Sequence, residues 1–365
     1  MESKAAKYAV VKQSIKQQIE NGTLAVNDRL PTEAEYAEIY QVSTITVRRA
    51  LTELAEEGYI KRLKHKGTFV TSPVSAEPTS HLIALILYSE DHNDSSYIQI
   101  IRGAQTMASS FRYSLIVEWT DADAVQEANA IQKMLNLNVE GLLLYSFDPA
   151  RSLENYRYLE QKGIPFVLLD RYDPGYPCYF SGCNNYDGGA IATRLLLEHG
   201  HEKILFAGYH FFLKPEQERY DGFCSMMRSA GLNVSRENLV MDIDYDRLAA
   251  QIRAREVTAL FCCNDRLAVK TIRSLRERGL RIPEDVSVIG FDDWTASPDV
   301  EKELTTVRQD FTEIGANTSY LLLSRLQGKL TGNPVKILSD VSLVVRKSVC
   351  DNPFRTDESP FSMNS

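Results

Sequence analysis

The chain has 365 residues, of which 44% are hydrophobic and 25% are charged, and its formal net charge is −8. This composition is ordinary for a globular protein and excludes a mostly disordered or collagen-like chain. The apolar runs are far shorter than the roughly 18 residues that cross a bilayer, and the first residues lack the apolar segment of a secretory signal. We therefore expect a cytoplasmic protein of two or three domains that has no membrane partner.

Charge is unevenly distributed along the chain. Residues 1–73 contain eleven Lys and Arg against nine Asp and Glu, a net charge of +2, and the remaining residues carry −10. A weakly basic head on an acidic body is compatible with nucleic-acid binding by the head alone. The six cysteines show neither metal-ligand nor disulfide spacing, and His199 and His201 fit a helix end better than a metal site. We expect no cofactor and no metal.

Residues 1–71 predict a small helical domain that ends in a hairpin. Apolar residues at helical spacing mark a helix at 7–20, a capping box at Thr32 opens a second helix, and Ser43 caps a third that ends before Gly58. Short strands at 59–63 and 68–70 flank a basic turn. This order predicts a winged helix-turn-helix whose third helix is narrow enough to enter a DNA major groove.

The candidate DNA contacts are polar residues of the third helix and of the basic turn. They lie off the apolar stripe of that helix, and the first turns of a recognition helix meet base edges and phosphates. A merely solvated helix face is the alternative, which the basic turn makes less attractive. The candidates are Ser43, Thr44, Thr46, Arg48, Arg49, Lys64, His65, Lys66 and Gly67.

Four blocks of this head resemble the GntR-type winged-helix domain: LPTE at 30–33, VSTITVRRAL at 42–51, LAEEG at 54–58 and KGTFV at 66–70. The resemblance implies operator binding as a dimer, with Glu33, Thr46 and Arg48 near double-stranded DNA and Gly67 in the minor groove. Thr44 stands where many members carry Arg, so the operator sequence does not carry over.

Residues 72–81 are rich in Ser, Thr and Pro and predict a linker. From 82 to 349, short apolar strands alternate with helices, which predicts a doubly wound parallel α/β fold in two lobes. A disordered tail is expected at 350–365. The expected strands are 82–87, 114–118, 141–145, 165–169, 203–207, 239–242, 259–263 and 286–291, and the helices are 98–109, 124–135, 186–198, 216–229, 266–278 and 312–326.

Ligands of open parallel sheets bind beyond the carboxyl ends of the strands. The groups there and at one nearby helix start suit a small polyhydroxylated ligand, because carboxylate, amide and guanidinium groups pair with hydroxyls and aromatic rings cover C–H surface. Asn264 could instead cap a helix, and Arg219 could form a surface ion pair. The candidate effector contacts are Tyr97, Asp148, Arg219, Asn264 and Asp292.

Six blocks of this body, in unbroken order, resemble the effector domain of LacI/GalR-type repressors and sugar-binding proteins of the periplasmic-binding-protein fold. They are NYDGG at 185–189, GHEKI at 200–204, RYDGF at 219–223, CND at 263–265, PEDVSVIGFDD at 283–293 and LTTVRQD at 304–310. The resemblance implies that Arg219, Asn264 and Asp292 hydrogen-bond the ligand, with weaker support for Asp148.

Together the two resemblances imply a transcriptional repressor that binds operator DNA as a homodimer and is released by a small sugar, with L-arabinose as the first candidate. Alternatives are another sugar, a nucleoside or a phosphorylated metabolite as effector, and a sugar-binding transport component as a different class. An enzyme is disfavoured because Asp292 and Asp293, adjacent on an extended segment, should point to opposite sides. Phosphate-binding loops and nucleophile elbows are also missing from the sequence.

Overall fold

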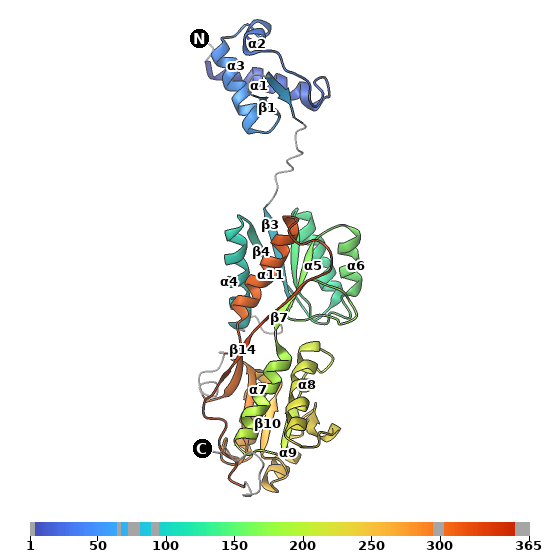
Figure 1. The fold of residues 1–365 in the computed structure, drawn as a ribbon, viewed down its shortest axis with the longest axis vertical. Coiled ribbons are helices and arrows are strands. Elements are labelled where there is room, and N and C mark those ends of the chain that lie inside the picture. The colour runs from blue at the N-terminus through green and yellow to red at the C-terminus, as the bar shows by residue number, and fades with distance from the viewer. Residues whose placement is uncertain (1–3, 64–66, 72–80, 89–94, 295–302, 355–365) are drawn as a thin grey trace. The chain divides into compact units, whose positions relative to one another are not determined.

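The chain forms two compact units, Met1–Ser80 and His81–Ser365 (Figure 1). This computed structural model describes residues 4–63, 67–71, 81–88, 95–294 and 303–354. The boundary between the units falls at the end of the expected linker, of which residues 72–80 lie outside the described residues.

The first unit is a winged helix, as its sequence predicts. Three helices precede a two-stranded antiparallel hairpin in which Ile60 pairs with Val70. The predicted capping box is present, since the Thr32 hydroxyl accepts from the Glu35 amide and the Glu35 carboxylate accepts from the Thr32 amide. The elements are α1 (Lys4–Glu20), α2 (Glu33–Ile39), α3 (Thr44–Glu56), β1 (Ile60–Leu63) and β2 (Gly67–Val70).

The core of this unit comes from the apolar stripes of α1 and α3. Val11 and Ile15 of α1 and Val47, Leu51 and Leu54 of α3 are at most 1% exposed. Each such side chain stabilises the fold by about 1.5–3 kcal/mol through burial. Packing of the two helices through these residues leaves the other face of α3 exposed.

The second unit contains two six-stranded sheets, one in each lobe of an α/β fold. The first lobe holds, in spatial order, β13 (Lys336–Ser339), β7 (Phe180–Cys183), β6 (Phe166–Leu169), β5 (Gly141–Tyr145), β3 (Leu82–Tyr88) and β4 (Ser114–Thr120). The second lobe holds β14 (Val341–Val344), β12 (Thr305–Gln309), β11 (Ser287–Asp292), β10 (Ala259–Cys262), β8 (Ile204–Ala207) and β9 (Leu239–Val240). The pairings are parallel apart from the antiparallel pair β12–β14.

The chain passes from one sheet to the other near residues 184, 310 and 340. Because of these crossings, α11 (Phe311–Leu326) follows a strand of the second lobe but packs on strands of the first lobe and along α4 (Ser95–Ser110). The other helices are α5 (Ala124–Asn136), α6 (Leu153–Gln161), α7 (Asn185–Glu198), α8 (Lys214–Ser229), α9 (Tyr245–Arg253) and α10 (Asp265–Glu277), with a short 3-10 turn at Arg236–Asn238.

The predicted doubly wound fold is thus confirmed, with several elements that the sequence analysis missed. They are the strands β7, β12, β13 and β14 and the helices α6 and α9. The strands are four or five residues long, and β13 and β14 expose part of each strand to solvent, so neither gives a continuous apolar run.

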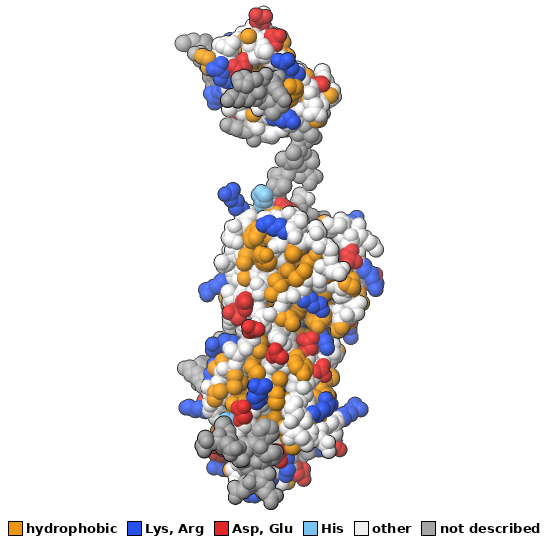
Figure 2. Space-filling view, viewed as in Figure 1, with side chains coloured by type: hydrophobic (Ala, Val, Ile, Leu, Met, Phe, Trp, Pro, Cys, Tyr) orange, Lys and Arg blue, Asp and Glu red, His pale blue; other side chains and the backbone are white. Residues whose placement is uncertain are grey.

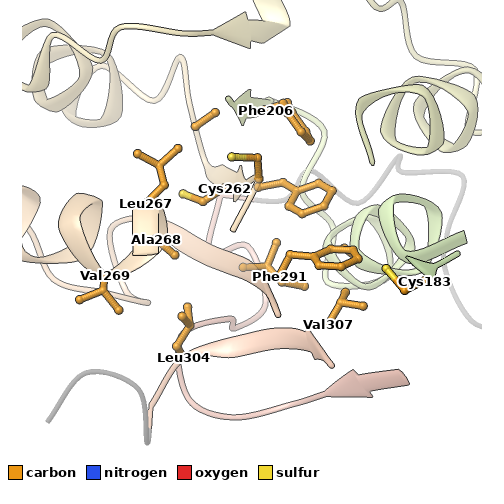
Figure 3. Close-up of a cluster of buried hydrophobic side chains, with 14 of the residues drawn as sticks. Cys183, Phe206, Cys262, Leu267, Ala268, Val269, Phe291, Leu304 and Val307 are labelled. Carbon is orange, nitrogen blue, oxygen red and sulfur yellow. The ribbon is translucent and has the colours of Figure 1, made fainter. Parts of the chain in front are cut away.

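Fully buried strand residues fill the interior of the second lobe (Figure 3). Phe206, Phe261 and Phe291 are each 0% exposed, and Phe291 lies with Val307 in the cluster that Figure 3 shows. Side chains on both faces of a parallel sheet are covered by helices, which is why these strands read as continuous apolar runs.

The expected disordered tail needs correction at its start. The Cys350 amide donates to the Ser287 hydroxyl over 3.1 Å, and the Asn352 amide donates to the His199 carbonyl over 2.8 Å. Residues 350–354 therefore pack against the second lobe, and 355–365 lie outside the described residues.

Candidate functional site

The start of α3 presents the predicted DNA-contact residues. Ser43 caps this helix by accepting a hydrogen bond from the Thr46 amide over 3.3 Å, and the two hydroxyl oxygens are 2.8 Å apart. Thr44, Arg48 and Arg49 are exposed on the first two turns. These side chains lie on the face that the α1–α3 packing leaves open, where a duplex could reach them.

Glu33 connects α3 to the hairpin of β1 and β2. One carboxylate oxygen lies 2.9 Å from Nε of Arg48, and the other lies 3.5 Å from a terminal nitrogen of Arg62 in β1. A carboxylate is repelled by phosphates, whereas the two arginines that it holds are attracted to them. The structure thus places Glu33, which the resemblance puts near DNA, as a partner of two basic residues.

The wing is the hairpin of β1 and β2, and β2 begins at Gly67, whose φ of 115° lies in the region that favours glycine. A Cβ at this position would lie 2.9 Å from Nε of Arg29, a flexible side chain that could shift, so the backbone conformation is what favours glycine here. The predicted wing contacts Lys64, His65 and Lys66 lie outside the described residues.

The second unit has a cleft of about 120 Å³ between its lobes, at the carboxyl ends of the strands. The first lobe lines this cleft with Tyr88, Ser96, Tyr97, Tyr145, Asp170 and Arg171. The second lobe contributes Tyr209, His210, Glu216, Arg219, Asn264, Arg266, Asp292, Trp294 and Gln309. Four predicted effector contacts, Tyr97, Arg219, Asn264 and Asp292, are therefore brought together.

Arg219 is the most firmly held of these side chains. Its Nε donates to Oδ1 of Asn185 over 2.8 Å, one terminal nitrogen donates to the Cys263 carbonyl over 2.6 Å, and the other lies 3.5 Å from Oδ1 of Asp292. The guanidinium also lies 3.7 Å from the ring centroid of Phe291. With 5% exposure, Arg219 is not the surface ion pair that the sequence left open.

Burial, the largest single influence, would lower the pKa of Arg219, but the nearby acidic groups, Asp292 first among them, together raise that pKa above its usual value. Arg219 is thus a permanent cation at the cleft. Fixed partners on three sides hold its guanidinium in one orientation, which a ligand oxygen can meet without reordering the side chain.

Asn264 caps α10, because its Oδ1 accepts from the Leu267 amide over 2.8 Å. Asn264 is therefore a helix cap, which the sequence analysis gave as the alternative to a ligand contact. The cap does not exclude a ligand contact. The cap uses the carbonyl oxygen of the side chain, whereas the amide group is a donor that a bound hydroxyl could use.

Asp292 is the last residue of β11, where it pairs with Arg308 of β12, and its φ is 113°. Its Oδ1 accepts a hydrogen bond from the Gln309 side chain over 2.7 Å. The neighbouring Asp293 pairs instead with Arg308 and Arg346 on the strands β12 and β14. The two carboxylates have separate partners. The expected extended segment reaches only to Asp292, since Asp293 follows the strand and has a φ of 56°.

Asp265 and Asp293, which lie close to Asp292, have pKa values shifted in opposite directions. Burial, and then the charge of Asp292, raise the pKa of Asp265 well above its usual value. Burial would also raise the pKa of Asp293, but hydrogen bonds from Arg346 and Arg308 lower it below its usual value. Asp265 accepts from the Trp294 amide over 2.8 Å and from the Thr306 hydroxyl over 2.6 Å, and so holds the turn that carries Trp294.

The first lobe presents Asp170 and Arg171 directly after β6. Asp170 has a φ of 63°, is 7% exposed, and its Oδ1 has no hydrogen-bond partner among the described residues. Arg171 donates to the Phe147 carbonyl over 2.9 Å and lies over the rings of Tyr145 and Tyr88. Asp170 thus offers a buried acceptor whose unmet hydrogen bond a ligand could supply.

The prediction for Asp148 needs correction. Asp148 does not line the cleft between the lobes but a separate small pocket beside α5. Its Oδ1 accepts from the Ala150 amide over 3.1 Å, and its Oδ2 lies 3.2 Å from Nε of Arg151. Through these contacts, the Asp148 carboxylate points towards the loop to which it belongs and not towards the cleft.

Several cleft residues were not among the predicted contacts. The Nε1 of Trp294 and the Oε1 of Gln309 are buried without a hydrogen-bond partner among the described residues. Glu216 is 5% exposed and accepts two loop amides. Gln309 lies in one of the sequence blocks that resemble LacI-type repressors, so its place in the cleft could have been predicted from that block. Glu216 and Trp294 lie outside these blocks, and no sequence pattern pointed to them.

His199 and His201, for which the sequence favoured a helix end over a metal site, lie at the end of α7. His199 is the C-cap of α7. His201 is buried, its Nε2 lies 3.0 Å from the Cys350 carbonyl, and burial lowers its pKa to about 4. Within the described ranges, no group of His, Cys, Asp and Glu is arranged to hold a metal ion.

A winged-helix unit followed by a two-lobed α/β body with a polar cleft defines a transcription regulator that binds a small effector. Residues 7–70 match the family described as bacterial regulatory proteins of the gntR family, and residues 193–349 match the periplasmic binding protein-like domain. Both resemblances noted in the sequence are confirmed. The chain is a transcriptional repressor that joins a GntR-type DNA-binding domain to a LacI-type effector domain.

Similar proteins cover nearly the whole chain. The arabinose metabolism transcriptional repressor of Halalkalibacterium halodurans is 28% identical over 94% of this chain and 97% of its own length. The repressor PurR of Haemophilus influenzae (strain PittEE) is 29% identical over 88% of this chain and 99% of its own. The solved regulator CelR in complex with cellobiose is 25% identical, with a TM-score of 0.65 over 85% of this chain and 92% of its own.

These relatives are repressors, and the chain is a repressor rather than an enzyme. Among the described residues, none of the helices combines the length and the apolar character that a membrane span requires.

Proposed function

We propose that the cleft binds a small neutral sugar, with L-arabinose as the first candidate, and that this binding releases the repressor from its operator. The observation that carries the proposal is the buried Arg219, fixed beside Asp292 and Asn264 at the cleft. A guanidinium, a carboxylate and an amide in one place provide donors and acceptors for neighbouring hydroxyls. A site that pairs each hydroxyl also rejects analogues that lack one.

The charge of the cleft favours a neutral ligand over a phosphorylated one. Its lining contains arginines and carboxylates in equal number among the described residues: Arg171, Arg219 and Arg266 against Asp170, Glu216 and Asp292. A phosphate would need an excess of positive charge or a ring of backbone amides at a helix N-terminus.

L-arabinose is favoured among sugars by the arabinose metabolism repressor that matches 94% of this chain. This repressor and the present chain are only 28% identical, and proteins that differ this much can bind different effectors. A second candidate in the same class is a nucleoside, because the rings of Tyr88, Tyr97, Tyr145 and Trp294 line the cleft and could stack on a base. The chain is about equally similar to PurR, so the effector should be tested with nucleosides as well as sugars.

The proposed DNA contacts are the exposed residues at the start of α3 together with the wing. Thr44, Thr46, Arg48 and Arg49 would meet the major groove and its phosphates, with Glu33 orienting Arg48. Gly67 and the basic residues at 64–66 would follow the adjoining backbone. A sugar-binding transport component has no use for this unit, which leaves a regulator as the favoured class.

We also propose a homodimer. Figure 2 shows hydrophobic side chains gathered on the face of the second unit that carries α11 and α7. The exposed apolar side chains of α11, α7 and the neighbouring α4 include Tyr320 at 45%, Tyr186 at 43% and Ile98 at 60% exposure. Exposed apolar patches of this kind mark association surfaces. A dimer would place two winged helices on two half-sites of an operator.

Calorimetric titration of the full chain with L-arabinose, other pentoses, hexoses and nucleosides tests the effector assignment. The expected result is saturable binding of L-arabinose and weaker binding of epimers that misplace one hydroxyl. Gel retention of an operator fragment should then fall as L-arabinose is added. Binding of another compound with no response to L-arabinose would overturn this assignment, and sedimentation as a monomer at micromolar concentration would overturn the dimer.

A further inference from the structure

A cluster of aromatic rings connects the two lobes beside the cleft. Phe147, which follows β5 of the first lobe, has its ring centroid 5.7 Å from that of His210 and 5.7 Å from that of Phe212. Both partners belong to the loop between β8 and α8 of the second lobe. On its own lobe, Phe147 lies 4.7 Å from the ring of Tyr88. Ring pairs at these separations attract one another beyond simple burial.

The loop that carries these rings, residues 209–213, is fixed at its base by one buried carboxylate. The amide of Tyr209 donates to Oε2 of Glu216 over 3.0 Å, and the amide of His210 donates to Oε1 over 2.8 Å. The Leu213 amide closes the turn by donating to the His210 carbonyl over 2.7 Å. Movement of this loop away from its position would break the two hydrogen bonds to Glu216, so exchange of the Tyr209 and His210 amides reports its opening.

The ring cluster is linked to the cleft from both lobes. Tyr209, His210 and Leu213 line the cleft, whereas Phe147 and Phe212 are not part of its lining. From the first lobe, the cleft residue Arg171 donates to the Phe147 carbonyl over 2.9 Å. A movement of the 209–213 loop away from Phe147 would thus change the wall of the cleft and the contact between the lobes together.

A second contact between the lobes lies at the base of the same loop. The Tyr172 hydroxyl of the first lobe donates to Oε1 of Glu218 in α8 over 2.8 Å. Glu218 is two residues beyond the loop anchor Glu216, so the ring cluster and this hydrogen bond restrain the same edge of α8.

We propose that residues 209–213 form a lid over the effector cleft, that the rings of His210 and Phe212 against Phe147 latch this lid to the first lobe, and that the latch controls access of the effector. The identity of the effector rests on the proposed function, but the latch itself does not. A closed lid with Tyr209 and His210 in the wall also limits the length of the ligand, so the latch would discriminate a single sugar from a longer one.

Amide hydrogen exchange of the full chain without sugar tests the latch directly. Phe147→Ala and Phe212→Ala should each accelerate exchange of the Tyr209 and His210 amides by about two- to tenfold. Phe212 is 52% exposed, so its removal leaves the core of the lobe intact. Because the two rings form one contact, the double variant should exchange no faster than the faster single variant.

Phe211→Ala is the matched control on the same loop. Its ring lies 5.5 Å from that of Tyr220, within the second lobe. The rate increases from Phe211→Ala and Phe147→Ala should multiply, since the ring of Phe211 packs on Tyr220 and the ring of Phe147 packs on His210 and Phe212. Multiplicative effects for Phe147→Ala with Phe212→Ala, or unchanged exchange in both single variants, would overturn the latch.

Sugar binding provides the second readout. In the latch variants, a sugar bound by the wild type should dissociate about two- to tenfold faster, and a disaccharide built from that sugar should gain affinity relative to the monosaccharide. If no sugar binds the wild type, the effector assignment fails while the exchange result still decides the latch. If sugar binds but its dissociation rate is unchanged in both variants, control of access by the latch is wrong.

Discussion

The guanidinium of Arg219 and the carboxylate of Asp292 approach to 3.5 Å at the carboxyl edge of the second sheet. Arg219 comes from α8 and Asp292 from the end of β11, so residues far apart in the chain meet at one point of the cleft. The pair combines a buried cation with an anion whose side chain is 24% exposed and which Gln309 also contacts. An effector that bridges the pair to the first lobe would bind better to the arrangement of lobes in which both sides reach it, and only such differential affinity can shift an equilibrium.

Arg219→Ala is expected to lower sugar affinity by at least about 100-fold, equivalent to roughly 3 kcal/mol, because it leaves Asp292 without its buried partner. Calorimetry measures this loss, and operator binding without sugar should stay unchanged. Arg308→Ala is the matched control, since Arg308 pairs with Asp293 over 2.7 Å and does not line the cleft. An equal loss in both variants would contradict the proposed role of Arg219.

Arg48→Ala should weaken operator binding by about 10- to 100-fold if Arg48 reads a base edge, corresponding to roughly 1–3 kcal/mol. If Arg48 contacts a phosphate instead, the loss should be similar for all sequences and the salt dependence should decrease. Gel retention at several salt concentrations separates these outcomes. Arg151→Ala, which removes an exposed arginine of the second unit, serves as the control. Loss of sugar binding by Arg48→Ala would refute the division of labour between the units.

Gly189→Ala tests the packing that positions Arg219. A Cβ on Gly189 in α7 would lie 2.1 Å from the backbone oxygen of Arg219 in α8, so the helices would have to separate. We expect a loss of roughly 1–3 kcal/mol in the free energy of unfolding, together with weaker sugar binding. Denaturant unfolding and calorimetry measure the two effects. Gly175→Ala, at an exposed loop position without positive φ, should change neither quantity.

Acid should destabilise the second unit through His201. Burial lowers the pKa of this histidine from 6.5 to about 4, so the unfolded chain takes up its proton first as the pH falls. The contribution is fully present above pH 6.5 and is lost as the pH falls towards 4, up to about 3 kcal/mol at 1.36 kcal/mol per unit.

His201→Gln removes the titrating group and can still donate to the Cys350 carbonyl. Free energies of unfolding measured between pH 7 and pH 4.5 should therefore fall less steeply in this variant than in the wild type. Parallel curves for the two proteins would show that His201 does not titrate as its burial requires.

Local signals explain why the winged helix was predictable. The cap at Ser43, the capping box at Thr32 and the apolar stripe of α3 are encoded within a few residues of one another. Exposure of Arg48 follows from the same periodicity. What periodicity does not contain is the pairing of Glu33 with Arg48 and Arg62, because those three side chains come from separate elements.

The cleft was predictable only in part. Positions at the ends of parallel strands converge whatever the loops do, which is why Asn264 and Asp292 were found. Asp148 stands at such an end too, but hydrogen bonds to its own loop and to Arg151 turn it away from the cleft. Glu216 escaped notice because it lies in a helix start and acts through loop amides.

The amino-acid order by itself determined the two units and their fold classes, and it predicted the helix that would face DNA and the sheet edge that would bind a ligand, because hydrophobic periodicity and capping act over short distances. Only the tertiary structure decided which side chains share the cleft, how Arg219 is held, and that Phe147 meets the 209–213 loop across the lobes. Those relationships depend on the directions of side chains from segments far apart in the chain, and such directions are set by packing, which no local pattern records.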